Sequence, residues 1–342
     1  MAQDLRKFFQ PGPRFQRADE GPAGPLVSVL ESPGKFVDLF AGYGGASTGA
    51  TNAGYDVVLA VDNWEHAVGV HQRNHPQADH LCMELPPAEP LPLPEAGEKW
   101  HLHGSPPCTF LSVAARYARS EERVAREEAE GLALVRWYLD FALGSSATTW
   151  SMEQVAHEGV IKLLKAYRAQ HRESIAWHVF DFAKLGLPQH RKRLIAGTPA
   201  LINKLKRTRK RRIGPRDVIA HPRGTHIRNE TLYQGSKSKP ETRIKYTASD
   251  MAKSISKPCY TIVAYKPLRW VTPGAEDPKA TLIRLSSYES SRIQGFPEGY
   301  YLPEGVVLAT RGVGNAVPPP VMEQLLTPRG RCVSPSLVWR PP

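Results

Sequence analysis

Short apolar runs alternate with longer amphipathic segments over roughly the first 200 residues of the chain. The apolar runs predict strands at residues 36–40, 57–61, 80–83, 148–155 and 174–182, and a further strand that enters Cys108. The segments between them have the spacing of helices, as at residues 65–74 and 121–143. Because strands and helices alternate, the sequence predicts a doubly wound α/β fold.

Changes in composition suggest how the chain is divided. Residues 1–34 mix Pro, Gly and charge with few apolar positions and predict a flexible leader. Its island Leu5-Arg6-Lys7-Phe8-Phe9 is compatible with a peptide that docks on a partner such as a replication clamp, although a frayed terminus is the simpler interpretation. We assign residues 35–199 to the α/β domain, 200–280 to a smaller domain, 281–328 to a return to the first domain and 329–342 to a tail.

A glycine turn follows the first predicted strand. The run Ala41-Gly42-Tyr43-Gly44-Gly45 leads into a helical segment, and glycines let a ligand approach the backbone at a helix start. The next strand ends in Asp62, where nucleoside-binding folds carry an acid for the ribose hydroxyls. The glycines do not follow the dinucleotide pattern and no Walker lysine follows them. S-adenosylmethionine therefore fits better than a dinucleotide or ATP.

Cys108 ends an apolar run, after Pro106 and Pro107. The prolines fix the backbone, so the thiol lies on a stiff loop at the carboxyl end of a strand, where α/β folds carry catalytic groups. A lone Cys is more often a small buried hydrophobe than a nucleophile. Glu153 interrupts another apolar strand. It is either the solvated end of that strand or a partly desolvated acid that can donate a proton to a base nitrogen.

Three polar residues alternate after the predicted strand at residues 174–182. Gln189, Arg191 and Arg193 would point to one face if this segment were a strand, although a solvated basic edge is the simpler interpretation. Further on, residues 204–212 are rich in Lys and Arg, whose mutual repulsion phosphate groups would relieve. A solvated loop is the alternative there.

The overall charge agrees with a polyanionic partner. The chain has 45 Lys and Arg against 33 Asp and Glu, a net charge of +12, which favours nucleic acid, although solubility alone explains part of it. The four cysteines form no close pair, so neither a zinc cluster nor a disulfide framework is expected, and the chain is expected to work in cytoplasm. No secretory signal and no apolar run of about 18 residues is present, so no membrane association is expected.

Six motifs, in order, resemble those of the DNA cytosine-5 methyltransferase family. The motifs are Asp38 to Gly45, Pro107-Cys108, Glu153-Gln154-Val155, Gln189-x-Arg191-x-Arg193, Arg284 to Pro297 and Gly314 to Pro319. The resemblance covers residues 36–198 and 281–326 and implies a Rossmann-like, S-adenosylmethionine-dependent methyltransferase domain. The residues between 200 and 280 would then form a small target-recognition domain.

The resemblance also implies roles for individual residues. The catalytic set is Cys108, Glu153, Gln189, Arg191 and Arg193. The cofactor-binding set is Phe40, Gly42, Tyr43, Gly44, Gly45, Asp62, Asn63, Glu84, Leu85, Pro107, Asn315 and Ala316. The DNA-binding set is Ser112, Arg207, Arg209, Arg211, Arg212, Arg228 and Thr261, and no metal is expected. Arg223 is another side chain suited to base edges.

The chain departs from the family pattern at a few of these positions. Gln154 replaces an Asn that holds the Pro-Cys loop in the family. Asp62 replaces a commoner Glu and Glu84 an Asp, so both keep the charge. Asn63 stands where several relatives stack a large side chain on adenine, with Trp64 next to it, and the sequence leaves open which of the two reaches the cofactor.

The resemblance implies methyl transfer to C5 of a flipped-out cytosine in a short duplex DNA site, through a covalent adduct with Cys108. Arg191 and Arg193 would favour the Cys108 thiolate, and Arg193 would also contact the cytosine carbonyl. Methylation of tRNA by the same chemistry and a catalytically silent DNA-binding protein of the same fold are the alternatives. The expected partners are double-stranded DNA and either a cognate restriction endonuclease or none. We expect a monomer in a bacterial, archaeal or phage-infected cell.

Overall fold

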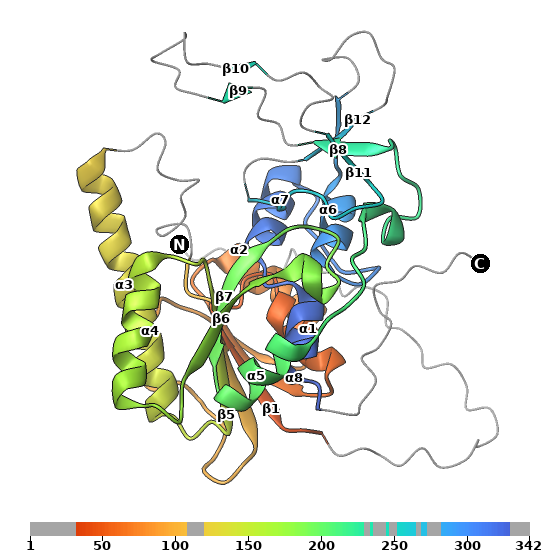
Figure 1. Ribbon diagram of the computed structural model, residues 1–342. Coiled ribbons are helices and arrows are strands. Elements are labelled where there is room, and N and C mark those ends of the chain that lie inside the picture. The colour runs from red at the N-terminus through yellow and green to blue at the C-terminus, as the bar shows by residue number, and fades with distance from the viewer. Residues whose placement is uncertain are drawn as a thin grey trace, which may run out of the picture. The chain divides into compact units, whose positions relative to one another are not determined.

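The computed structural model describes residues 32–107, 120–228, 233–234, 244–245, 252–264, 268–271 and 282–328 (Figure 1). All of them belong to one compact unit. The predicted leader, the predicted tail, Cys108 and Ser112 lie outside these residues, apart from positions 32–34 of the leader.

The described residues contain a seven-stranded sheet with the order β3-β2-β1-β4-β5-β7-β6. The strands are β1 (Lys35–Leu39), β2 (Asp56–Asp62), β3 (Asp79–Cys82), β4 (Trp100–Gly104), β5 (Thr149–Gln154), β6 (Ala176–Asp181) and β7 (Lys192–Gly197). Strands β1 to β5 pair in parallel, and β7 runs antiparallel to both of its neighbours. The strand order reverses on either side of β1 and β4, the position at which doubly wound sheets bind their ligands.

Helices cover both faces of this sheet (Figure 1). They are α1 (Gly45–Asn52), α2 (Glu65–Asn74), α3 (Glu121–Gly144), α4 (Glu158–Gln170), α5 (Pro199–Arg207) and α8 (Pro319–Leu326), with a 3-10 turn η3 (Phe182–Leu185) after β6. Val37 and Leu39 of β1 pack in the core on the side of α3 and α4, whereas Phe36 packs with α1, α5 and α8. Because side chains alternate along β1, this strand contributes to the hydrophobic cores on both faces of the sheet.

The structure confirms the predicted doubly wound fold and the strands and helices of the first 182 residues within one to three positions. Helix α2 has the predicted bounds. Two local expectations differ from the structure. Strand β7 begins only at Lys192, so Gln189 and Arg191 precede it. The boundary predicted at residue 200 falls inside α5, because Ile202 and Leu205 of this helix are buried against the sheet.

The chain returns to the sheet through its last motif. Helices α6 (Ser287–Gln294) and α7 (Val306–Asn315) precede α8, which packs closely on α1. A Cβ added at Gly45 would lie 2.0 Å from the carbonyl oxygen of Val317, and one at Gly49 would lie 2.3 Å from that of Pro319. Only glycine permits this approach, so the glycines of α1 bring the C-terminal motif to the start of the sheet.

A second, four-stranded antiparallel sheet has the order β11-β8-β12-β13. Its strands are β8 (His226–Arg228), β11 (Ala252–Ser254), β12 (Arg269–Val271) and β13 (Leu282–Arg284), and a short ladder joins β9 (Tyr233–Gln234) to β10 (Ile244–Lys245). The 3-10 turn η4 (Pro215–Asp217) precedes β8. Ile227 and Trp270 are fully buried in a core shared with Ile293 and Val313 of α6 and α7. None of the helices in the described part of the chain has the length and apolar character needed to cross a bilayer.

Asp38 is a buried carboxyl in the middle of β1. Its Oδ2 accepts hydrogen bonds from the backbone amide of Ser47, at 3.2 Å, and from the Ser47 hydroxyl, at 2.6 Å. Its Oδ1 has no hydrogen-bond partner among the described residues. Burial raises the pKa of Asp38 from 3.8 to about 7, although the bonds from Ser47 act in the opposite direction.

We therefore predict that the free energy of unfolding falls as pH rises from about 4 through 7, because the folded state must ionise a buried acid that the unfolded state ionises freely. Asp38→Asn keeps an acceptor for Ser47 and never ionises, so it should remove much of this slope, which is at most about 1.4 kcal/mol for each pH unit. Urea unfolding at pH 5, 6, 7 and 8 measures both slopes. Parallel slopes for the variant and the wild type would show that Asp38 is not the titrating group.

Candidate active site

A cavity of about 180 Å³ lies at the carboxyl ends of β1, β2 and β4. Four segments that are distant in the sequence form its wall. The lining residues are Phe40, Ala41, Gly42, Ala46, Asp62, Asn63, Trp64, Ser105, Pro107, Arg311, Gly312, Asn315, Ala316 and Val317. The wall thus combines the glycine turn, the end of β2, the loop that leads to Cys108 and the last motif.

Asp62 ties the glycine turn to the end of β2. Its Oδ2 accepts a hydrogen bond from the amide of Gly42, at 2.8 Å, and its Oδ1 accepts one from the amide of Trp64, at 2.9 Å. Burial raises the pKa of Asp62, while these amides and the nearby Arg311 act against that shift. A carboxylate oxygen can accept two hydrogen bonds, so Asp62 can still accept hydrogen bonds from the hydroxyl groups of a ligand.

Gly42 faces open space in the cavity. Its backbone has a φ of +54°, and a Cβ built on it would meet no atom within 4 Å. By contrast, the Tyr43 side chain is fully buried, and its hydroxyl donates to the carbonyl oxygen of Leu308 at 3.0 Å. The glycine turn therefore presents backbone, rather than side chains, to the cavity.

The structure brings seven of the twelve predicted cofactor residues into the lining. These are Phe40, Gly42, Asp62, Asn63, Pro107, Asn315 and Ala316. Tyr43, Gly44, Gly45, Glu84 and Leu85 are not part of it, and their contact with a cofactor stays a prediction. Both Asn63 and Trp64 line the cavity, so the structure does not separate the two candidates that the sequence left open.

Glu153 and Arg193 form a buried ion pair between β5 and β7. Arg193 Nε lies 3.1 Å from Glu153 Oε1, and the two side chains are only 14% and 8% exposed. Arg193 also donates a hydrogen bond from Nη1 to the carbonyl oxygen of Lys192. Because β5 and β7 are antiparallel neighbours, the pairing of these strands fixes the carboxylate and the guanidinium relative to each other.

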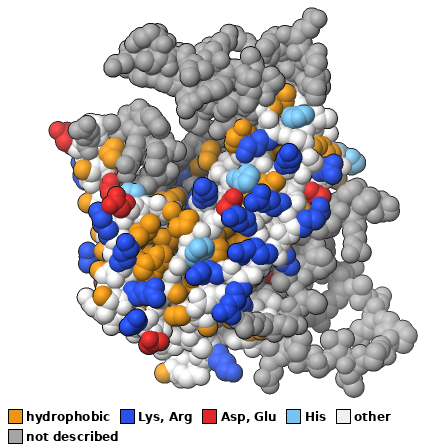
Figure 2. Space-filling view, viewed as in Figure 1, with side chains coloured by type: hydrophobic (Ala, Val, Ile, Leu, Met, Phe, Trp, Pro, Cys, Tyr) orange, Lys and Arg blue, Asp and Glu red, His pale blue; other side chains and the backbone are white. Residues whose placement is uncertain are grey.

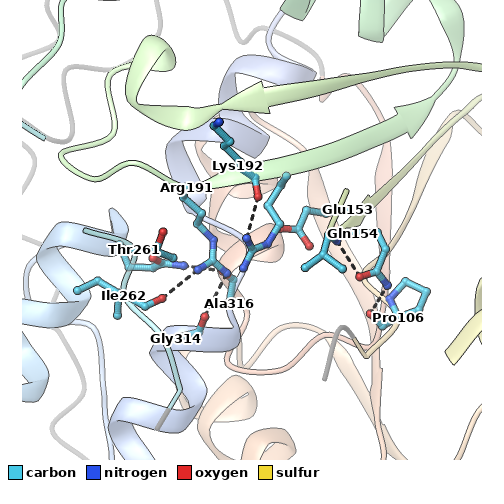
Figure 3. Close-up of polar contacts among 12 residues, drawn as sticks. Pro106, Glu153, Gln154, Arg191, Lys192, Thr261, Ile262, Gly314 and Ala316 are labelled. Carbon is cyan, nitrogen blue, oxygen red and sulfur yellow. Dashed lines mark hydrogen bonds and ion pairs between the residues drawn. The ribbon is translucent and has the colours of Figure 1, made fainter. Parts of the chain in front are cut away.

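Gln154 holds the loop that leads to Cys108 (Figure 3). Its Nε2 donates to the carbonyl oxygen of Pro106 at 3.0 Å, and its Oε1 accepts from the amide of Val155 at 2.8 Å. The Gln that replaces the usual Asn of the family thus contacts the loop that the Asn was expected to hold. Cys108 itself follows Pro107 in the chain and lies outside the described residues.

Arg191, two residues before Arg193 in the chain, is fully buried, and its guanidinium donates to backbone carbonyl groups (Figure 3). Nη1 donates to Ile262 at 3.1 Å, and Nη2 donates to Gly314 at 3.1 Å and Ala316 at 3.2 Å. Gln189 Oε1 accepts from the amide of Ile262 at 2.8 Å. These two side chains therefore join the segment before β7 to the segment at 262 and to the last motif.

The predicted DNA-binding residues have varied surroundings. Arg228 is buried in β8, and the Thr261 hydroxyl donates to the carbonyl oxygen of His190. Arg209 donates to two nearby carbonyl groups, Arg211 lies 3.5 Å from Asp217, and Arg207 and Arg212 are exposed. None of these residues lines the cavity. Figure 2 shows Lys and Arg side chains gathered on the face that carries α4, β6 and α5.

Arg223, which the sequence offered as a possible contact to a base, is bound to a carboxylate in the structure. Its Nε and Nη2 donate to the two oxygens of Glu289, at 3.0 and 2.6 Å. The Trp270 indole donates to the same carboxylate at 3.1 Å. This pair holds the second sheet on the start of α6.

Arg311 is a lining residue that the sequence analysis did not identify. It lies on α7 one turn before Asn315, and residues four apart on a helix share a face. That spacing was a usable signal, because the role of Asn315 was expected from its motif.

Comparisons with known proteins agree with this arrangement. The family of C-5 cytosine-specific DNA methylases matches residues 34–126 and 167–328. The type II methyltransferase M.HgiDI of Herpetosiphon aurantiacus is 32% identical over 167 residues, which are 46% of this chain and 50% of that relative. The type II methyltransferase M.MthTI of Methanothermobacter thermautotrophicus is 25% identical over 330 residues, covering 85% of this chain and 95% of the relative.

A similar fold occurs in the crystal structure of the S. pombe Dnmt2 methyltransferase, with a TM-score of 0.53 and 14% identity over 85% of this chain and 96% of that one. The chain spans between half and two thirds of the length of the Herpetosiphon aurantiacus relatives that it matches. The family match, however, covers well over half of the sequence and includes the glycine turn, the Pro-Cys loop and the last motif. The chain therefore belongs to the C-5 cytosine-specific DNA methylase family.

Proposed function

We propose that the chain transfers a methyl group from S-adenosylmethionine to C5 of a cytosine in duplex DNA. The observation that carries this proposal is the buried Glu153–Arg193 pair next to a proline loop that Gln154 holds and that leads to Cys108. One residue of the same loop, Pro107, also lines the cavity. Gln154, the neighbour of the proposed base-binding acid in β5, thus connects that acid to the loop that leads to Cys108, and the loop reaches the cavity at Pro107.

The cavity has the features that a nucleoside cofactor needs. Asp62 offers a carboxylate for hydroxyl groups, Gly42 leaves room beside the backbone, and Asn315 provides an amide in the lining. S-adenosylmethionine would supply an electrophilic methyl group there. The residues of the chain would hold its ribose at Asp62 and its amino-acid end along the glycine turn and the last motif.

Cytosine C5 is a poor nucleophile and lies inside the duplex, so the base must first be flipped out at a cost of a few kcal/mol. The Cys108 thiolate then adds to C6 while Glu153 hydrogen-bonds N3, which places electron density on C5. C5 would then bond to the methyl carbon while the bond between that carbon and the sulfonium sulfur breaks, and S-adenosylhomocysteine would leave. A base next removes the proton from C5, the electron pair restores the C5–C6 double bond, and Cys108 leaves as the thiolate.

Arg193 and Arg191 have different parts in this proposal. Arg193 lies beside Glu153, so in this proposal it orients the acid and also contacts the carbonyl of the flipped-out cytosine. Arg191 is bound to three carbonyl groups. We propose that Arg191 positions the last motif and the segment at 262, instead of activating Cys108 as the sequence suggested.

Radiolabel transfer decides among the substrates. Label from S-adenosylmethionine is expected in duplex DNA and not in tRNA, and the label should be lost with Cys108→Ala. Transfer to tRNA alone would exclude the proposal, and so would DNA binding without transfer to either. Bisulfite sequencing of DNA from cells that express the chain would then identify the site, and would show whether it matches that of a restriction endonuclease in the same cell.

The first prediction concerns the cavity. Gly42→Val places a side chain in open space within the cavity, so the affinity for S-adenosylhomocysteine should fall at least tenfold in calorimetric titrations. Gly97→Val is the matched control, because Gly97 also has a positive φ, of +95°, and no atom within 4 Å of an added Cβ, yet it does not line the cavity. Equal losses in both variants would attribute the effect to backbone strain and would exclude a cofactor site at Gly42.

The second prediction concerns the proline loop. Gln154→Ala removes the donor to Pro106, so kcat for methyl transfer should fall at least tenfold, since small displacements of a nucleophile are costly. The affinity for S-adenosylhomocysteine should change little. Gln72→Ala, on the exposed side of α2, serves as the control. An unchanged kcat in Gln154→Ala would show that this contact does not position Cys108.

The third prediction concerns covalent catalysis. An oligonucleotide with 5-fluorocytosine at the target base should trap the enzyme, because fluorine cannot leave as a proton would. The adduct should survive denaturing electrophoresis and be absent in Cys108→Ala. Glu153→Gln should retain DNA binding and form the adduct far more slowly, because it cannot donate the same proton to N3. An adduct that mass spectrometry locates at Cys82, Cys259 or Cys332 would refute the assignment.

A further inference from the structure

Three side chains form a continuous stack beside the cavity. The rings of Tyr43 and Trp64 are stacked with their centroids 5.7 Å apart and an angle of 19° between their planes. The Arg311 guanidinium carbon lies 4.2 Å from the centroid of the Trp64 ring. Trp64 and Arg311 both line the cavity. A cation on an indole face is held there with an energy of roughly 1 kcal/mol.

The packing of α7 determines where Arg311 lies. Tyr43 binds the carbonyl oxygen of Leu308, one turn before Gly312. A Cβ added at Gly312 would lie 2.1 Å from the Tyr43 ring, so the absence of a side chain there lets the helix approach the ring. These two contacts fix the rotation and height of α7. Arg311 is consequently directed onto Trp64, and Asn315, four residues later, lines the same cavity.

The guanidinium retains an unused donor. Arg311 Nε is buried and has no hydrogen-bond partner within the described parts of the chain. A buried donor without a partner costs about 1–3 kcal/mol. Because Nε is buried away from the cavity, an acceptor on a bound ligand would meet the Nη donors at the end of the same guanidinium.

The neighbouring acid indicates which part of a ligand this acceptor belongs to. Burial raises the pKa of Asp62, and the charge of Arg311 opposes that shift, so the two groups are close, and both line the cavity. If Asp62 binds the ribose, the adenine acceptor next to that ribose is N3, because N3 is on the edge of the base that adjoins the sugar. N1 and N7 point away from it.

We propose that Arg311 is a specificity-determining residue for the adenosine part of the cofactor, and that its guanidinium donates a hydrogen bond to N3 of adenine. This inference rests on the proposed use of S-adenosylmethionine. Trp64 acts through Arg311, because its contact with the guanidinium holds that group in the wall of the cavity. The pair thus distinguishes adenine from bases that lack an acceptor at this position.

Calorimetric titration of two variants with three ligands tests the proposal. Arg311→Met keeps the aliphatic stem without the donors, and Arg311→Lys keeps the charge without the planar guanidinium. Both should bind S-adenosylhomocysteine at least tenfold more weakly than the wild type, and adenosine weaker by a similar factor. The wild type should lose about the same factor with the 3-deaza analogue of S-adenosylhomocysteine, whereas the two variants should bind that analogue and the parent ligand equally.

Arg73→Met is the matched control, because the Arg73 guanidinium carbon lies 3.8 Å from the Tyr301 ring centroid in a comparable contact outside the cavity. It should leave all affinities unchanged, and thermal melting should show that each variant is folded. A loss for S-adenosylhomocysteine without a loss for adenosine would mean that Arg311 binds the carboxylate, and would overturn the proposal. The proposal would also be overturned if Arg311→Met and the loss of N3 in the 3-deaza analogue weakened binding additively. A wild type that binds neither ligand would refute the proposed cofactor itself.

Discussion

The buried guanidinium of Arg191 joins three segments that are far apart in the chain. Its donors reach Ile262 on one side and Gly314 and Ala316 on the other, so the segment before β7, the segment at 262 and the last motif meet at one charge. A buried cation without partners would cost several kcal/mol, and the carbonyl groups offset that cost only if all of the segments are in place. The geometry of the cavity depends on this condition, because Ala316 lies in its wall.

The sequence predicts the sheet well, because the signal of each strand is local. Val57 to Val61 is a continuous apolar run, and the helix after Trp64 has a period of 3.6, and neither signal needs distant information. The role of Arg191 did not follow from the same kind of reasoning. Alternation with Gln189 and Arg193 predicted one common face, but the carbonyl groups that bind Arg191 come from positions 71 and more residues away. No local pattern contains that contact.

The candidate site likewise contains residues whose role the sequence predicts and residues whose role it does not. Asp62 was predictable, since an acid at the end of the second strand has a fixed place relative to the glycine turn. The spacing of Arg311, one turn before Asn315, could have suggested that it lines the cavity, but its contact with Trp64 was not predictable. That contact depends on the packing of Tyr43 on Gly312, and neither residue has a spacing that reveals the other. The absence of a side chain at Gly312 has meaning only once the Tyr43 ring is known to pack there. Close packing of large on small residues between distant segments is the part of a fold that a single sequence conceals.

The two prolines before Cys108 connect the halves of the proposed reaction. Pro107 lines the cofactor cavity, and the carbonyl oxygen of Pro106 is the group that Gln154 binds. Neither proline has an N–H group, so the carbonyl oxygen is the only backbone group through which each can form a hydrogen bond. With φ fixed at both positions, the loop has few conformations to lose when it is ordered. The distance between methyl donor and nucleophile would therefore be set by a rigid dipeptide, anchored by one side chain of the strand that also carries Glu153.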